Sequence, residues 1–430
     1  MLRKLLQNKF VRGSAIFTLA SFGVSLLNYV FNLLVARFFP LDIYGEYMTA
    51  IVYMGFLTVP FGALNILLIR RIGMTQVAER QALLSLVEEW VIKYIKQHFF
   101  WCLLIVTTIA GILATQTNLK LESVIWILLM TAVSLATLLY SASLQAFKKF
   151  LASGLLGMIT TLFKIVGGTL VLLTMPRLPL IYLSMILASA LAFFVARSWV
   201  KEKSGLLQPL SYNLQHPLAY FKKKSVLIPT LATFGMIGIL SLDVIMVKKF
   251  FGADEAGLYA GLSLLGKIVL YLTAPIASVA YAFFIGSDSK QNGFKILLTT
   301  SVLIIVAGLV IFAGYYFFPE LVVKIIFGQK FLSIAPLAYL VAIFGIGYSL
   351  ANLFIQYLIS INHASSLFSV VVMIGQAVAI GIYHQTFFQI IIIGIVATSL
   401  LTCLCLSSIV KHHQQTLAKK LLSKLRLGWL

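Results

Sequence analysis

The sequence RFFPLDIYGEY at residues 37–47 recurs in altered form as KFFGADEAGLY at residues 249–259. Five of the eleven positions are identical, one more pairs Arg with Lys, and the two copies lie about half the chain length apart. Each copy follows one apolar run and leads into the next. The repeat therefore predicts an internal duplication, with an equivalent set of helices in each half of the chain.

The composition places this duplicated chain in a membrane. Hydrophobic residues make up 61% of the sequence and charged residues 10%, with a mean hydropathy of +1.02. A soluble domain is about 25% charged, so a soluble enzyme is excluded. Because roughly 20 apolar residues span a bilayer as a helix, the sequence predicts twelve spans, at residues 13–36, 44–69, 99–115, 123–147, 150–174, 180–199, 226–247, 256–284, 296–318, 332–360, 364–383 and 386–410.

These observations predict an all-α polytopic membrane protein with about twelve transmembrane helices in two pseudo-symmetric six-helix bundles. An even number of crossings gives both halves the same orientation, around a central cavity. The predicted domains are an N-terminal bundle at 1–199 that begins with an amphipathic helix, a cytoplasmic linker at 200–225, a C-terminal bundle at 226–410, and a basic cytoplasmic tail at 411–430.

The loops differ strongly in positive charge. Of the 33 Lys and Arg residues, 24 fall at the termini and in the loops on the same side as the termini, and 7 fall in the opposite loops. Cytoplasmic loops are the ones enriched in Lys and Arg, so both termini are predicted to be cytoplasmic. The net charge of +21 is then an orientation signal and an attraction for anionic membrane lipids, with no nucleic-acid partner.

Three charged residues lie well inside the predicted spans, away from their ends: Lys164, Lys267 and Asp243. A charge at the bilayer centre costs about 2.5–3.5 kcal/mol on insertion scales. The corresponding positions of the other half hold no charge, so the duplication does not account for them; they are Gln376, Gly55 and Phe31. We expect the two lysines to bind an anionic substrate. The alternative is a structural ion pair of Asp243 with one lysine, or a role of Asp243 in coupling transport to an ion.

Polar residues form a stripe along the first span. Ser21, Ser25, Asn28 and Asn32 share one helical face that runs toward Arg37. The stripe is expected to face a cavity, or else to form hydrogen bonds to a neighbouring helix. Amides, hydroxyls and isolated cations suit a hydroxyl-rich anion such as a sugar phosphate, so Asn28, Asn32, Arg37, Lys164 and Lys267 are the predicted substrate-binding residues.

The sequence predicts no enzyme, cofactor or metal site. Residues 261–268 approach a phosphate-binding loop, but Ile268 replaces its magnesium-binding hydroxyl and no strand precedes it. The six histidines have no metal-ligand spacing, and the adjacent acids Asp254 and Glu255 are expected to cap the helix that follows them. The outer loops are too short for a catalytic domain, which weighs against a membrane-bound O-antigen polymerase or ligase.

Several of these features together resemble a known family. The basic start, the SLLNY sequence at 25–29, the motif at 36–47, and Asp243 with the motif at 249–259 resemble bacterial polysaccharide transporters. These are the O-antigen or capsule repeat-unit flippases of the multidrug/oligosaccharidyl-lipid/polysaccharide exporter superfamily. The resemblance covers the whole chain and implies the multidrug-exporter-like fold, with two bundles that rock around a cationic cavity.

The resemblance also implies a function. The substrate would be an undecaprenyl-pyrophosphate-linked oligosaccharide, moved from the cytoplasmic to the periplasmic leaflet of the bacterial inner membrane for O-antigen, lipopolysaccharide, capsule or exopolysaccharide synthesis. A polysaccharide polymerase and a chain-length regulator would be further partners. The nearest alternative is a multidrug:cation antiporter of the same superfamily, although such an exporter favours acidic groups in its cavity, and here lysines outnumber Asp243.

Overall fold

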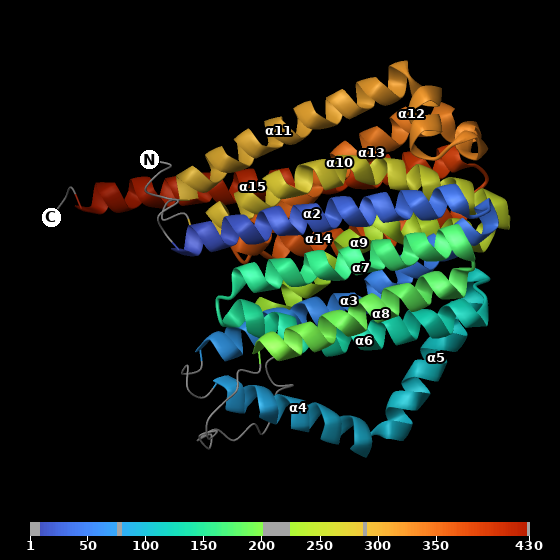
Figure 1. The fold of residues 1–430 in the computed structure, drawn as a ribbon. Coiled ribbons are helices and arrows are strands. Elements are labelled where there is room, and N and C mark those ends of the chain that lie inside the picture. Colours follow the sequence, from blue (N-terminus) through green and yellow to red (C-terminus); the bar gives the residue numbers. More distant parts are fainter. Residues whose placement is uncertain (1–8, 75–79, 201–223, 287–289, 428–430) are drawn as a thin grey trace. The chain divides into compact units, whose positions relative to one another are not determined.

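The computed structural model describes residues 9–74, 80–200, 224–286 and 290–427, and these residues form helices joined by short connections (Figure 1). Within this described part of the chain, twelve helices are long and apolar enough to cross a membrane. The predicted all-helical fold class with twelve spans is therefore confirmed. Most of the predicted 200–225 linker, and residues 1–8 of the predicted amphipathic helix, lie outside the described residues.

The helices of the first half have the following bounds: α2 Lys9–Phe38, α3 Leu41–Met74, α4 Arg80–Gln97, α5 Phe99–Thr117, α6 Leu121–Ala146, α7 Phe150–Thr174 and α8 Leu178–Val200. Those of the second half are α9 Lys224–Phe250, α10 Ala253–Gly286, α11 Lys290–Phe317, α12 Pro319–Ile326, η3 Gln329–Leu337, α13 Ala338–Ser360, η4 Ala364–Leu367, α14 Phe368–Ile382 and α15 Phe387–Leu427.

The chain divides into two compact units. The first contains residues 1–230 together with Val244–Ala260, and the second contains Leu231–Asp243 and Gly261–Leu430. The end of α9 and the start of α10 therefore belong to the first unit, although they come from the second half of the sequence. The predicted domain boundaries remain a prediction.

In the first unit the main helix contacts follow the order α2, α7, α8, α6 and α3. The amphipathic segment before the third span is a separate helix, α4, whose residues Leu83 and Leu84 are buried. It meets α5 at an angle (Figure 1). Further along α4, Glu88 accepts a hydrogen bond of 2.8 Å from the Tyr140 hydroxyl of α6. An apolar face and one polar contact therefore hold this short helix on the bundle.

Each repeat copy forms the start of a helix. Asp42 lies in the first turn of α3, and Asp254 and Glu255 lie in that of α10. The Glu255 carboxylate accepts a hydrogen bond of 2.9 Å from the Gly252 backbone N–H. This bond satisfies a backbone donor that the helix leaves unpaired, and the negative charges favour the positive end of the helix dipole. The capping role predicted for this acidic pair is confirmed for Glu255.

The second unit packs around α13, which contacts both α11 and α15. Its core includes the buried side chains of Met236, Tyr357 and Leu401. Helix α9 passes α14 so closely that a Cβ atom on Gly235 would lie 2.5 Å from the Ser369 carbonyl carbon. This position requires glycine because the obstacle is backbone, which cannot rotate away.

We predict that Gly235→Ala destabilises the protein by about 1–3 kcal/mol through overpacking. Two other glycines serve as controls. At Gly23, the equivalent position in the first half, the nearest neighbour of a Cβ atom would lie at 3.5 Å, and at Gly375 of α14 a Cβ atom would have no neighbour within 4 Å. Gly23→Ala and Gly375→Ala should be neutral or slightly stabilising, because alanine is the better helix former. Thermal unfolding of the detergent-solubilised variants measures the difference, and equal stability of all three would contradict this account.

Candidate functional site

The predicted polar stripe of α2 turns two of its side chains toward other helices. The Asn28 side-chain oxygen accepts a hydrogen bond from the Lys164 ammonium of α7, while its amide nitrogen donates to the Val24 carbonyl at 2.9 Å. The Asn32 oxygen accepts a bond of 2.9 Å from the Tyr47 hydroxyl of α3. The two asparagines therefore make the helix–helix hydrogen bonds that were the alternative to a cavity.

Lys164 is held on the α2-facing side of α7. Its ammonium nitrogen lies 4.9 Å from the centre of the Phe31 ring, which is the geometry of a cation–π contact. One turn further along α7, a Cβ atom on Gly168 would lie 2.3 Å from the Phe31 ring. Glycine at this position lets α7 approach the aromatic ring, and the ring in turn covers the lysine. A half-buried cation with an amide and an aromatic partner is thereby built into the first unit.

Arg37 lies apart from this cluster. It is exposed in the last turn of α2, roughly 13 Å along the helix axis from Asn28 at 1.5 Å per residue. The structure therefore brings together Lys164 and Asn28 by direct contact, with Asn32 one turn further along the same face, and it leaves Arg37 at the end of the helix.

The other two predicted charges both lie in the second unit. Asp243 of α9 and Lys267 of α10 are buried, with 7% and 6% of their surface exposed, and they interact electrostatically. Ser263, one turn before Lys267, has a buried hydroxyl oxygen with no hydrogen-bond partner among the described residues. This attraction is what the structural ion-pair alternative predicts, and it remains a prediction. Lys164, in the first unit, is instead held by an amide and an aromatic ring.

Gln376 of α14 is a buried polar residue that sequence reasoning did not assign to the site. Its amide nitrogen donates a bond of 3.4 Å to the Ile239 carbonyl, one turn before Asp243, and its oxygen is buried without a hydrogen-bond partner in the described chain. The internal repeat could have indicated Gln376, because this residue occupies the position of the second half that corresponds to Lys164. The duplicated helix pairs α2–α7 and α9–α14 therefore each bury a polar side chain at the same position.

Glu46 was also missed, although it belongs to the repeat motif. This carboxylate is 4% exposed and accepts hydrogen bonds from the Ser123 hydroxyl at 2.5 Å and the Lys120 backbone N–H at 3.3 Å. The Lys120 ammonium lies 3.9 Å away. The equivalent position in the second copy is Leu258. An acidic residue with no charged equivalent in the other copy is the sequence feature that could have indicated Glu46. A buried charge therefore lies at the start of α3.

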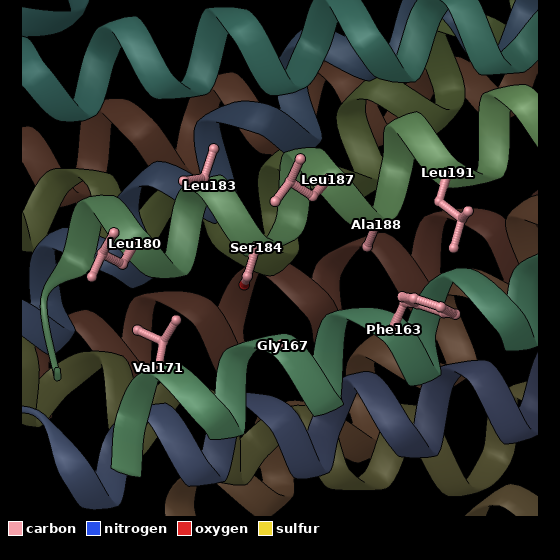
Figure 2. Close-up of a pocket in the computed structure, with 9 residues that line it drawn as sticks. All are labelled: Phe163, Gly167, Val171, Leu180, Leu183, Ser184, Leu187, Ala188 and Leu191. Atoms are coloured by element: carbon pink, nitrogen blue, oxygen red, sulfur yellow. The ribbon is translucent and has the colours of Figure 1, made fainter. Parts of the chain in front are cut away.

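An apolar hollow of about 460 Å³ lies between α7 and α8. Figure 2 shows Phe163 and Val171 of α7 and the leucines of α8 around it, with Ser184 as the one side chain that carries an oxygen. Phe163 is the neighbour of Lys164 in sequence, but Lys164 bonds to α2 on another side of α7. The hollow is therefore separate from the polar cluster. Across the described residues, no three His, Cys, Asp or Glu side chains are placed to hold a metal ion.

The fold matches solved membrane transporters. The structure of the lipid II flippase MurJ in an inward closed conformation aligns with 91% of this chain and 87% of its own, with a TM-score of 0.66 and 12% identity. An inward-facing multidrug resistance MATE family transporter of the MOP superfamily aligns with 93% of this chain and 99% of its own, with a TM-score of 0.61 and 14% identity. The chain has the fold of these transporters.

A third match is the MATE multidrug transporter DinF-BH, with a TM-score of 0.62, 13% identity, and coverage of 94% of this chain and 96% of the other. No protein-family model and no curated protein sequence matches the chain. The predicted multidrug-exporter-like fold is thus confirmed, and at identities this low the comparison shows the fold alone.

We predict that the hydrogen bond between Lys164 and Asn28 contributes measurably to stability. Asn28→Ala should cost about 1–3 kcal/mol, because it leaves the ammonium without its acceptor. Combining it with Lys164→Met should cost less than the sum of the two single changes, since the second change removes the group that the first left unsatisfied. Unfolding of the detergent-solubilised single and double variants provides the measurement.

Ser25→Ala is the matched control, one turn earlier on the same stripe, where the hydroxyl donates to the Ser21 carbonyl of its own helix at 3.0 Å. We expect it to change stability by less than about 0.5 kcal/mol. Additive effects of Asn28→Ala and Lys164→Met would show that the two side chains do not support each other.

Proposed function

We propose that the protein is a flippase for undecaprenyl-pyrophosphate-linked oligosaccharide repeat units. It moves them from the cytoplasmic to the periplasmic leaflet, by alternating access around a cationic cavity, to supply O-antigen, capsule or exopolysaccharide synthesis. The protein acts in the bacterial inner membrane with both termini in the cytoplasm, next to a polysaccharide polymerase and a chain-length regulator. The reaction needs no cofactor and no covalent chemistry.

The observation that supports this proposal most strongly is the chemistry of the first unit. Lys164 supplies a cation, and Asn28 and Asn32 supply amides that exchange hydrogen bonds with hydroxyl-bearing or charged partners. Pyrophosphate carries negative charge and a sugar carries hydroxyl groups, so a ligand of this class can take over both kinds of bond. Arg37 adds a cation at the end of the same helix. In the second unit, Lys267 is the other proposed binding group, and its interaction with Asp243 makes it the weaker attractor of an anion.

The fold comparison supports transport of a lipid-linked substrate. One neighbour is a flippase for lipid II. The substrate proposed for this chain is also a lipid, with a charged pyrophosphate head and an apolar tail. A transporter of this kind must shield the head from the hydrocarbon core, because each unsatisfied polar group there costs several kcal/mol. Polar side chains buried inside otherwise apolar helices provide that shielding.

A multidrug transporter is the second candidate, because other neighbours with the same fold are multidrug transporters. Asp243 would then be the group that binds a coupling ion or a cationic substrate. Its electrostatic interaction with Lys267 weighs against this role, since a nearby cation lowers the attraction of the carboxylate for a second cation. The cation Lys164 in the first unit also repels a cationic drug.

The decisive experiment follows lipid-linked oligosaccharides in a strain that lacks the gene. Under the proposed function, complete repeat units accumulate on the cytoplasmic face and the surface glycan is lost. Unpolymerised single units in the periplasm would identify a polymerase instead. Normal surface glycan, in a strain without a redundant transporter, would favour drug export.

We predict that Lys164→Ala and Lys267→Ala each reduce glycan export at least about tenfold while membrane insertion stays intact, because each loses a charge-assisted contact of about 1.5–3 kcal/mol. Export is measured as surface glycan in complemented deletion cells, and protein level is checked by immunoblotting of membranes. Lys324→Ala is the control, since Lys324 is an exposed residue of the short helix α12. Full export by the Lys164→Ala, Lys267→Ala double variant would refute the cationic cavity.

A further inference from the structure

The two repeat copies contact each other. Gly45 of α3 and Gly257 of α10 are equivalent positions of the two copies. A Cβ atom on Gly257 would lie 1.9 Å from the Leu41 carbonyl oxygen, and one on Gly45 would lie 2.7 Å from the Gly257 backbone nitrogen. The helices therefore cross backbone to backbone at the point where the duplicated motifs match, as two equivalent surfaces do around a two-fold axis.

Two buried charged residues lie near this crossing, and neither has a charged equivalent in the other half of the sequence. Lys248, at the end of α9, is 7% exposed and interacts electrostatically with Glu46 and Asp42 of α3. The positions equivalent to Lys248 and Glu46 are Ala36 and Leu258. One half of the sequence therefore contributes a buried cation beside the crossing and the other a buried carboxylate, and the two interact electrostatically.

A hydrogen bond at the surface also links the segment Val244–Ala260 to helix α5. The Lys249 ammonium donates a hydrogen bond of 3.2 Å to the side-chain oxygen of Gln116, at the end of α5. Both side chains are exposed. The segment Val244–Ala260 is thus fixed to the first unit at the glycine crossing, at Lys248 and at Lys249.

This attachment matters because the segment belongs to the second half of the sequence. Helices α9 and α10 pack in the first unit at their connected ends and in the second unit over most of their remaining length. Any movement of one sequence half against the other must therefore break this attachment or bend the helices beside it. Opposite buried charges suit a contact that breaks, because both groups regain hydration when it opens and the net cost is small.

We propose that the two repeat segments form a latch that closes the predicted outer side of the transport route, and that Lys248 and Glu46 set how readily it opens. The latch consists of Asp42, Gly45 and Glu46 on α3 and of Lys248 and Gly257 on the α9–α10 segment. This inference rests on the proposed alternating-access function. Release of a substrate to the outside requires the latch to open.

Crosslinking at this surface hydrogen bond tests whether the latch must open. Gln116→Cys and Lys249→Cys are combined in a protein whose native cysteines are replaced by serine, and the pair is bridged with a short bifunctional thiol reagent. We expect the short bridge to lower glycan flipping at least about tenfold, and a long flexible bridge to leave it unchanged. Unchanged flipping with the short bridge in place would make the segment a hinge and overturn the latch.

A second measurement needs no glycan substrate, so it separates the latch from the proposed function. Ala256 is 3% exposed, and its carbonyl carbon would lie 3.1 Å from a Cβ atom on Gly45. In intact cells, Ala256→Cys should react slowly with a membrane-impermeant maleimide. Adding Lys248→Glu should speed the labelling several-fold, because like charges then face each other at the crossing.

Two further variants control this measurement. Adding Glu46→Gln to Lys248→Glu removes the like-charge repulsion while the side-chain oxygen can still accept the bonds from Ser123 and Lys120, and it should slow the labelling again. Gly55→Ala on α3, where a Cβ atom meets no neighbour within 4 Å, should have no effect, whereas Gly257→Ala should speed the labelling. Equal labelling rates in all variants at equal membrane levels would refute the latch, whatever the protein transports.

Discussion

Lys164 and Lys267 place two ammonium groups among apolar helices. The free-energy cost of burying these charges determines which polar groups lie inside each unit. An isolated charge in the hydrocarbon core is expensive, so each lysine has a partner. Lys164 has the Asn28 oxygen and the Phe31 ring, and Lys267 has Asp243. The partners differ in a way that matters for binding. An amide leaves the cation's charge uncompensated, whereas a carboxylate neutralises it, so the first unit offers an anion the stronger attraction.

The duplication supplied the scaffold on which this chemistry diverged. Helix pairs α2–α7 and α9–α14 occupy equivalent places in the sequence, and each buries a polar residue at the same position, Lys164 in one and Gln376 in the other. The close packing diverged as well, since Gly235 of the second half meets backbone, whereas the equivalent Gly23 meets a methionine side chain. Equivalent helices thus keep their order while their contacts serve different purposes.

Tyr47 links the polar cluster to the start of α3. Its hydroxyl donates to Asn32, and its ring stacks on Tyr44 and on Tyr182 of α8 with centres 6.5 and 6.4 Å away. Tyr47 follows Glu46 directly in the sequence. A ligand that binds Asn32 would therefore free the Tyr47 side chain, which lies in the same helical turn as Glu46 of the proposed latch. Substrate binding could in this way affect the closure of the outer side.

Twelve spans, the all-helical class and the half-length repeat were determined by the sequence alone, because apolar length and residue identity are properties of the chain itself. The sequence also indicated Asn28 and Lys164, since each is a polar residue in an apolar span. Their contact between distant helices was decided only by the tertiary structure, as were the burial of Glu46 and Gln376 and the crossing of the two repeat copies. These depend on how each helix is rotated against its neighbours, and that rotation follows from packing many side chains at once.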